Sequence, residues 1–403
     1  ENSNTNDGKE TENDLIQGND SDSSQEKAEE NITEEESKED NMEAQQEEPS
    51  EETDSEEAVT QRKVLNINDG WNFSTNDTST AGWNFPSGAG NGVVNLPHSW
   101  EYVHPRQSYI PQMNSKTVTY EKTVNISEIK NKNLFIKFYG AARNTEVFID
   151  GEKVGTHVGG YSAFVFDITN YVQGKDEITI KANVTNIDTV SIPINVDYTQ
   201  WGGIYRDVEL ISTDDQYISL EDYGNKGIYI DSNVNVKNEI SNKSNDDKEL
   251  KIVTDIYDAD GNKVTGTEQK VTAKANKNVQ PYSTKCQIDN VHLWNGTKDP
   301  YLYTANVTVY NENDEVLDTV SDNFGVRTYE IKNGKFYLNG QEYEIHGVGM
   351  HQDREGYGNA VPDDLKVQDM NLMQEMGVNA IRTSHYPHSQ STYNLADERG
   401  MLV

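Results

Sequence analysis

Short β-rich runs separated by turn residues fill the chain from Val64 onward, and they constrain the fold more than any other feature. Residues 117–124, 134–139, 146–149 and 177–182 alternate or cluster β-branched and aromatic residues. Asp150-Gly151 follows the third run, and this dipeptide favours a two-residue hairpin because both positions tolerate positive φ. No helical period competes with these signals, so the stretch that ends near Ile211 predicts an all-β sandwich.

A second strand-rich stretch runs from about residue 216 to 324 and has the length of an immunoglobulin-like sandwich. Asp260-Gly261 joins its two clearest runs, 250–258 and 263–272, and a third covers 305–310. The single cysteine, Cys286, excludes an internal disulfide framework and a cysteine-based zinc cluster. We interpret it as a structural strand or loop residue in preference to a catalytic thiol.

After Arg327 the pattern changes to alternating strands and helices. Residues 344–349 and 378–383 predict buried strands, and a predicted helix between them ends at Gly377. Asp363 is the expected N-cap of this helix. Its expected buried face carries Leu365, Leu372, Met373 and Met376.

The same region continues with a predicted helix over 391–399, stopped by Gly400, and residues 401–403 open a third strand. Strand, helix, strand, helix, strand is the beginning of a parallel α/β array. Two and a half units cannot close a sheet or barrel, so we expect the chain to be a fragment.

Charge is distributed unevenly along the chain. Of the 69 acidic and 34 basic residues, residues 1–60 hold 23 Asp and Glu against 3 Lys, about −20 of the total −35. This segment predicts a disordered, self-repelling acidic spacer, with a cation- or partner-binding tail as the alternative. The net charge excludes nucleic acid as a partner, because phosphates require clustered Lys and Arg.

No run of residues approaches the roughly 18 to 20 apolar positions that a membrane span requires. The chain starts at Glu1 and no signal peptide is visible. The acidic spacer and the scarcity of cysteine favour an extracellular or cell-surface location.

Histidines follow both predicted strands of the α/β region. His351 is followed by Gln352-Asp353-Arg354, and His385 stands three residues after Arg382. In a (β/α)8 barrel the carboxyl ends of neighbouring strands meet at the catalytic face. We therefore expect these side chains to donate hydrogen bonds to a polyhydroxylated ligand. The alternative is that each histidine satisfies a buried backbone carbonyl.

These segments resemble a known enzyme family. GVGMHQDREGYG, MGVNAIRTSHYPH and YNLADERGMLV are similar to the opening of the catalytic barrel of glycoside hydrolase family 2, with β-galactosidases as the best match. GEKVGTHVGGYSAFVFDIT and WGGIYRDVELI resemble its jelly-roll sugar-binding domain. VHLWNGTKDPYLYTANV and FGVRTYEI resemble its immunoglobulin-like domain and the junction into the barrel.

The resemblance covers roughly residues 62–403 and implies a multidomain fold. We expect an acidic leader over 1–60, a jelly-roll β-sandwich over 61–212 and an immunoglobulin-like β-sandwich over 213–326. The first strands and helices of a (β/α)8 TIM barrel would then cover 327–403, which leaves that barrel incomplete.

The resemblance also implies roles for individual residues. His351 and His385 match the barrel histidines that bind the sugar, and Arg382 matches an arginine of the same subsite. Asp197 matches an aspartate that meets the sugar's 6-hydroxyl and a bound sodium ion; the alternative is a solvated turn carboxylate. Gly202-Gly203 indicates a tight backbone approach and not a phosphate cradle, because no helix follows it.

The implied activity is retaining hydrolysis of terminal β-D-galactosides. It requires two carboxylates about 5 to 5.5 Å apart, which in this family are glutamates on later strands, beyond Val403. We assign no catalytic residue within the chain: Glu355 lies in a glycine-rich loop without a partner carboxylate, and Glu398 lies near a helix end on the wrong face. The chain on its own is therefore expected to be inactive.

The remaining expectations concern ligands and alternatives. The partner is a carbohydrate, no cofactor is required, Na⁺ or Mg²⁺ is allowed as an accessory ion, and oligomerisation is left open. β-Glucuronidases and β-mannosidases share the architecture and the SHYP run, whereas His-Gln-Asp-Arg favours galactosidase. The alternative of a different class is a non-catalytic carbohydrate-binding module.

Overall fold

The structure is a computed structural model that describes residues 62–75, 91–100, 117–129, 131–186 and 198–403. All of these belong to one of the chain's two structural units, Glu56–Val403. Within the described residues, no helix is both long and apolar enough to cross a membrane.

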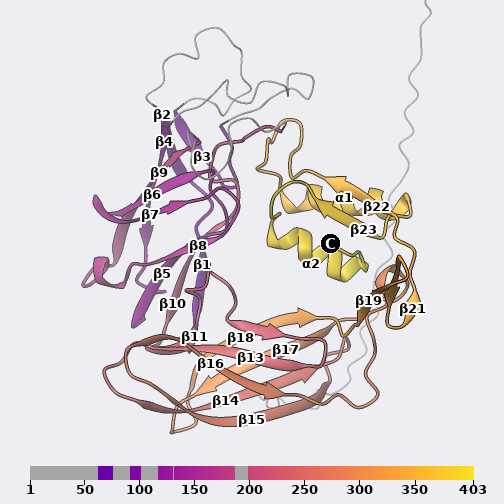
Figure 1. Ribbon diagram of the computed structural model, residues 1–403. Coiled ribbons are helices and arrows are strands. Elements are labelled where there is room, and N and C mark those ends of the chain that lie inside the picture. Colours follow the sequence, from indigo (N-terminus) through magenta and orange to yellow (C-terminus); the bar gives the residue numbers. More distant parts are fainter. Residues whose placement is uncertain (1–61, 76–90, 101–116, 130, 187–197) are drawn as a thin grey trace, which may run out of the picture. The chain divides into compact units, whose positions relative to one another are not determined.

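The first sandwich consists of two antiparallel sheets that share one core (Figure 1). One sheet has the order β1-β10-β5-β8 and contains β1 (Lys63–Asn66), β10 (Val208–Thr213), β5 (Asn133–Phe138) and β8 (Phe164–Asp167). The other has the order β3-β2-β4-β9-β6-β7 and contains β3 (Gly92–Val94), β2 (Trp71–Thr75), β4 (Thr117–Asn125), β9 (Glu177–Thr185), β6 (Asn144–Ile149) and β7 (Glu152–Val158). Alternate residues of both sheets point inward, and Trp71, Tyr120 and Phe138 are among the fully buried side chains.

The predicted hairpin in this domain is confirmed. Asp150 and Gly151 join β6 to β7 with φ angles of 49° and 84°. Positive φ at both central residues matches the right-handed twist of the paired strands.

The second sandwich also has two sheets. In one, β13 (Asn235–Asn242) pairs with β11 (Gln216–Ile218), β12 (Ile228–Ile230) and β16 (Lys277–Lys285). The other has the order β15-β14-β17-β18 and contains β15 (Lys263–Ala273), β14 (Lys248–Tyr257), β17 (Tyr303–Tyr310) and β18 (Val316–Phe324). Cys286 is buried in the core between them, and burial raises the pKa of its thiol, so it has the character of a core residue.

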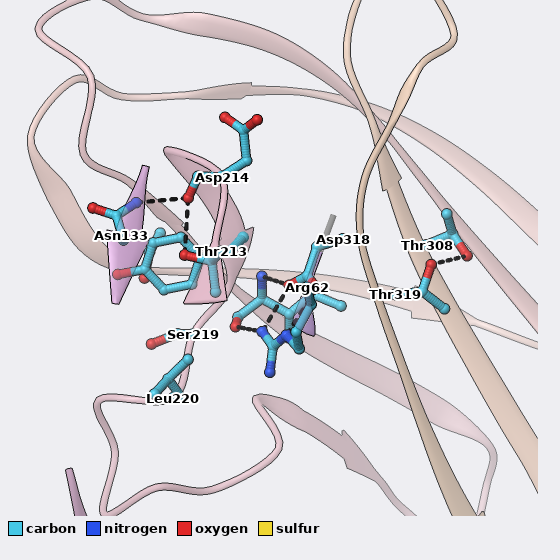
Figure 2. A network of polar contacts seen from close by, with 12 residues as sticks. Arg62, Asn133, Thr213, Asp214, Ser219, Leu220, Thr308, Asp318 and Thr319 are labelled. Carbon is cyan, nitrogen blue, oxygen red and sulfur yellow. Dashed lines mark hydrogen bonds and ion pairs between the residues drawn. The ribbon is translucent and has the colours of Figure 1, made fainter. Parts of the chain in front are cut away.

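A buried ion pair joins the two sandwiches (Figure 2). Arg62, just before β1, donates from Nε and Nη2 to both carboxylate oxygens of Asp318 on β18, at 2.8 and 2.7 Å. The same guanidinium donates to the carbonyl oxygen of Ile218, whose N–H in turn donates to Asp318. Two-point pairing of this kind fixes orientation as well as distance.

A small antiparallel sheet leads into the α/β region and consists of β19 (Tyr329–Lys332), β20 (Lys335–Leu338) and β21 (Gln341–Glu342). It is followed by β22 (Gly347–Met350), α1 (Asp363–Glu375), β23 (Ala380–Thr383) and α2 (Gln390–Arg399). Strand β22 pairs in parallel with β23, and Leu402 forms a parallel bridge with Ala380 on the other side of β23. The predicted alternation of strands and helices is confirmed, but the predicted burial of the first strand is wrong, because β22 contains no buried residue.

Two details of the expected first helix are wrong. Pro362, not Asp363, occupies the N-cap position, and Asp363 is the first helical residue. Leu372 and Met376 are 56% and 73% exposed, whereas Met370 and Met373 are buried. The helix turns its 370/373 face to the core, because only that face meets residues of β23 and α2 such as Ile381 and Ala396.

Both predicted glycine stops are confirmed. Gly377 follows α1 with φ 76°, and Gly400 is the C-cap of α2 with φ 74°. A left-handed residue at this position lets its N–H reach back to the last carbonyls of the helix.

Candidate functional site

The two histidines singled out in the sequence lie against each other. His351 follows β22 and His385 follows β23, and the last register pair of these strands is Met350 with Thr383. The imidazole centroids are 5.2 Å apart with an edge-to-face angle of 86°. Parallel pairing therefore brings both rings to the carboxyl-terminal edge of the two strands.

Tyrosines from the first sandwich complete the ring cluster. The ring centroid of Tyr198 lies 5.8 Å from that of each histidine and 5.6 Å from that of Tyr386. Tyr161, between β7 and β8, stacks on Tyr386 at 4.3 Å and 6°. The cluster is thus built jointly by the first sandwich and the α/β region.

Arg206 holds the segments that carry these rings. It is largely buried, and its guanidinium donates to the carbonyl oxygens of Tyr161 at 2.9 Å and Pro387 at 2.8 Å, and to the Gln352 side-chain oxygen at 3.3 Å. The Gln352 oxygen also accepts the Ser389 N–H at 2.7 Å. One side chain of the first sandwich therefore fixes the residues that follow both histidines.

Burial keeps two tyrosines of the cluster and the neighbouring His388 uncharged. It raises the pKa of the Tyr161 and Tyr386 hydroxyls, so both stay protonated at neutral pH. Burial also lowers the pKa of His388 to about 4. Neutral donors of this kind suit a ligand that carries many hydroxyl groups.

Asp353 supplies a carboxylate beside His351. Asp353 is exposed, yet neighbouring groups partly desolvate its carboxyl, and this desolvation raises the pKa of the carboxyl against the opposing effects of His351 and the Trp201 indole. The cluster therefore offers an acceptor as well as donors.

Two further site residues were expected from the sequence, Arg382 and Asp197. Arg382 lies exposed on β23, opposite Gly349 in the register, and its guanidinium has no hydrogen-bond or ion-pair partner in the part of the chain that the structure describes. Asp197, the expected sodium ligand, lies outside the described residues, so no ion site can be assembled around it. Over residues 62–403, apart from the undescribed gaps, no three His, Cys, Asp or Glu residues are grouped to hold a metal ion.

The two glycines before the Arg206 segment make the tight backbone approach that the sequence predicts. A Cβ on Gly202 would lie 2.0 Å from the Trp100 ring, and one on Gly203 would lie 2.2 Å from the His98 carbonyl oxygen. Gly203 also has φ 141°, a region that L side chains rarely adopt.

The structure also shows where the two glutamates lie that we rejected as catalytic residues. Glu355 is exposed in the loop after β22. Glu398 is exposed near the end of α2, where it lines a groove with residues of β17 and β18.

Sequence reasoning did not single out Tyr161 and Arg206. Both lie in motifs that resemble the family, GGYSAF and YRDV, but neither stands in a spacing pattern that indicates a role. Their function depends on contacts with residues about 180 to 225 positions away, which no local pattern encodes.

Comparison with known proteins identifies the three regions. Residues 93–214 match the sugar-binding domain of glycosyl hydrolases family 2, residues 219–327 match a second model of that family, and residues 329–403 match its TIM barrel domain. The order agrees with the expected jelly-roll, immunoglobulin-like and TIM-barrel series.

Curated relatives and a solved structure agree with these matches. The chain is 33% identical to a β-glucuronidase of Bacteroides fragilis, over 85% of this chain and 49% of that protein. It is 32% identical to a β-galactosidase of Thermoanaerobacter pseudethanolicus, over 85% and 46%. The crystal structure of a Bacteroides uniformis β-glucuronidase superposes with a TM-score of 0.74 and 28% identity, over 85% of this chain and 42% of that one.

The chain spans about half the length of the curated relatives that it matches. Three consecutive domain models of one family cover most of the described residues in the family's order, and relatives above 30% identity span the same region. The chain belongs to glycosyl hydrolases family 2.

Proposed function

We propose that this chain forms part of the sugar-binding site of a retaining glycosidase that acts on terminal β-D-galactosides. The observation that carries the proposal is the pairing of His351 with His385 at the carboxyl ends of adjacent parallel strands, closed from the first sandwich by Tyr198. A β-galactosidase among the relatives supports the choice of sugar.

The cluster can bind a sugar through hydrogen bonds. Imidazole and phenol groups donate to hydroxyl oxygens, and Asp353 accepts from a hydroxyl group. The cavity that His351 and Asp353 help to line measures only about 10 Å³, too small for a sugar ring, so the described residues form one wall of the site and do not enclose it. We propose that Asp197, together with a sodium ion, binds the 6-hydroxyl of the sugar.

The proposed reaction is a double displacement. One carboxylate attacks the anomeric carbon, while a second protonates the departing oxygen and later activates water. We expect this pair from the part of the relatives' length that the present chain does not span, and this chain's residues bind and orient the glycone.

A β-glucuronidase is the second candidate. Arg382 is an exposed cation without an ion-pair partner among the described residues, and a glucuronide carboxylate would supply one. The B. fragilis relative, a β-glucuronidase, supports this reading to a similar degree. Asp353 in the same cluster opposes it, because a carboxylate repels an anionic sugar.

Kinetics of the complete gene product test the proposal. Nitrophenyl β-D-galactoside should be turned over with a higher kcat/KM than nitrophenyl β-D-glucuronide. His351→Ala and His385→Ala should each lower kcat/KM about ten- to a hundredfold, with part of the loss in kcat, because a donor to the reacting sugar is worth about 1 to 3 kcal/mol. His346→Ala, an exposed histidine before β22, is the matched control and should change neither constant.

Three outcomes would count against the proposal. Faster turnover of the glucuronide, together with a larger loss in Arg382→Ala for that substrate, would assign the second function. Normal kinetics with a lowered unfolding midpoint would assign the histidines to the scaffold. Turnover by residues 1–403 alone, surviving further purification, would show that the carboxylate pair lies within this chain.

A further inference from the structure

A groove with both polar and apolar lining separates the second sandwich from helix α2. Two adjoining cavities of about 680 and 230 Å³ share four lining residues, Leu302, Ser321, Asn323 and Glu398. Together they follow the outer face of β17 and β18 and reach the end of α2. The combined volume lies in the range of small-ligand sites.

Three asparagines of this groove are bonded in the same way. The Asn323 side-chain oxygen accepts from Thr304, that of Asn306 accepts from Ser321, and that of Asn394 on α2 accepts from Gln390. Their side-chain NH2 groups have no partner among the residues that the structure describes. Each asparagine therefore presents two donors to the groove with its amide orientation already set.

The groove also offers an aromatic wall and acceptors. Tyr257 and Tyr301 line it, and the Tyr301 ring is held parallel to His292 at 3.9 Å. The other end carries the carboxylates of Asp322, Asp397 and Glu398 together with Lys226, which forms an ion pair with Asp322. Burial raises the pKa of Asp397 against the opposing charge of Arg327, with smaller contributions in the same direction as burial from Asp322 and Glu398, so the acidic side chains outnumber Lys226 at this end.

We propose that this groove binds a neutral oligosaccharide chain, apart from the histidine cluster. Sugar hydroxyls accept from the asparagine NH2 groups and donate to the carboxylates, and a C–H face of the ring can pack on a tyrosine ring, whose face is negative. An anionic glycan is disfavoured, because the carboxylates repel it. The proposal does not depend on which glycoside the catalytic site accepts.

The test is an NMR titration of the 403-residue chain with a β-1,4-linked galactotetraose, followed through backbone amides of β17, β18 and α2. We expect saturable shifts of these amides. Asn306→Ala combined with Asn323→Ala should weaken binding at least tenfold, because two NH2 groups with two donors each are lost. Asn394→Ala should weaken it about threefold and leaves a good helix former in α2, so its result does not depend on folding of the sandwich.

Two controls separate the groove from other sites. Thr308→Ala removes a hydroxyl pair with Thr319 from the same sheet face, outside the groove lining, and should leave binding unchanged (Figure 2). His385→Ala should also leave the groove shifts unchanged. Absence of saturable shifts in folded protein, binding that survives all three asparagine changes, or tighter binding of tetragalacturonate would each overturn the proposal.

Discussion

Two arginines tie the first sandwich to the rest of the structure, and they use opposite chemistry. Arg62 pairs with the carboxylate of Asp318, which is fully buried, and with one carbonyl oxygen. Arg206 donates to carbonyl and amide oxygens of four residues and, within the described ranges, has no carboxylate partner.

The difference in chemistry fits the structural roles of the Arg62 and Arg206 junctions. An ion pair holds two sandwiches in one orientation, but it makes each partner depend on the other, because a buried charge left alone is costly. With neutral acceptors, the guanidinium of Arg206 can hydrogen-bond to several backbone carbonyl oxygens at once. At the histidine cluster this arrangement fixes two loops without adding another carboxylate.

The largest expected effect comes from breaking the ion pair. Asp318→Ala should lower the free energy of unfolding by about 3 to 5 kcal/mol, because Arg62 and the Ile218 N–H lose their acceptor. Urea unfolding measures the loss. Asp322→Ala, on the same strand but in an exposed pair with Lys226, is the control and should cost at most about 1 kcal/mol. Equal losses would show that the buried pair has no special role.

Acid should destabilise the junction that Arg206 makes between the first sandwich and the α/β region, through protonation of His388. Its pKa of about 4 in the folded protein lies below the ordinary 6.5, chiefly because of burial, with the positive charge of Arg206 acting in the same direction. Since the unfolded chain takes up the proton first, stability that is fully present above pH 6.5 should fall by about 3 kcal/mol as the pH drops to 4. Unfolding curves of His388→Gln should lack this component, whereas those of His346→Gln should keep it. An unchanged pH profile in His388→Gln would contradict the assignment.

Arg206→Ala should cost about 2 kcal/mol, less than Asp318→Ala, because the acceptors left behind are neutral. The sharper measurement is the NMR spectrum of the His351 and His385 rings, which should shift in Arg206→Ala and not in Arg62→Ala. Arg206→Lys should restore little, since an ammonium group cannot span the same acceptors. Unshifted histidine signals would remove the positioning role.

The smallest effect is expected from the acidic leader. Deletion of residues 1–60 stops short of Arg62, so the ion pair stays, and a segment with this composition has little apolar area to bury. The thermal midpoint should not change within error. A lowered midpoint would show that the leader packs against the domains.

The sequence predicted structural elements well wherever the type of a single residue sets the backbone conformation. The Asp150-Gly151 turn and the stops at Gly377 and Gly400 need backbone conformations that few residues adopt, so the residue type reveals the conformation. The burial of helix α1 was predicted poorly. Leu372 and Met376 have the right spacing for a core face, but a core also requires a neighbouring element, and none of the described ones covers them.

The sequence by itself determined the kinds of domain, their order and the proximity of His351 to His385. Periodicity, turn residues and strand ends are properties of neighbouring positions, so the sequence reveals them directly. Only the tertiary structure decided which side chains surround those histidines. Tyr161 and Arg206 meet the loop after β23 across about 180 to 225 residues of chain. Such contacts depend on how separate domains pack, and the free energy that selects them comes from burial and hydrogen bonding between surfaces that no short segment contains.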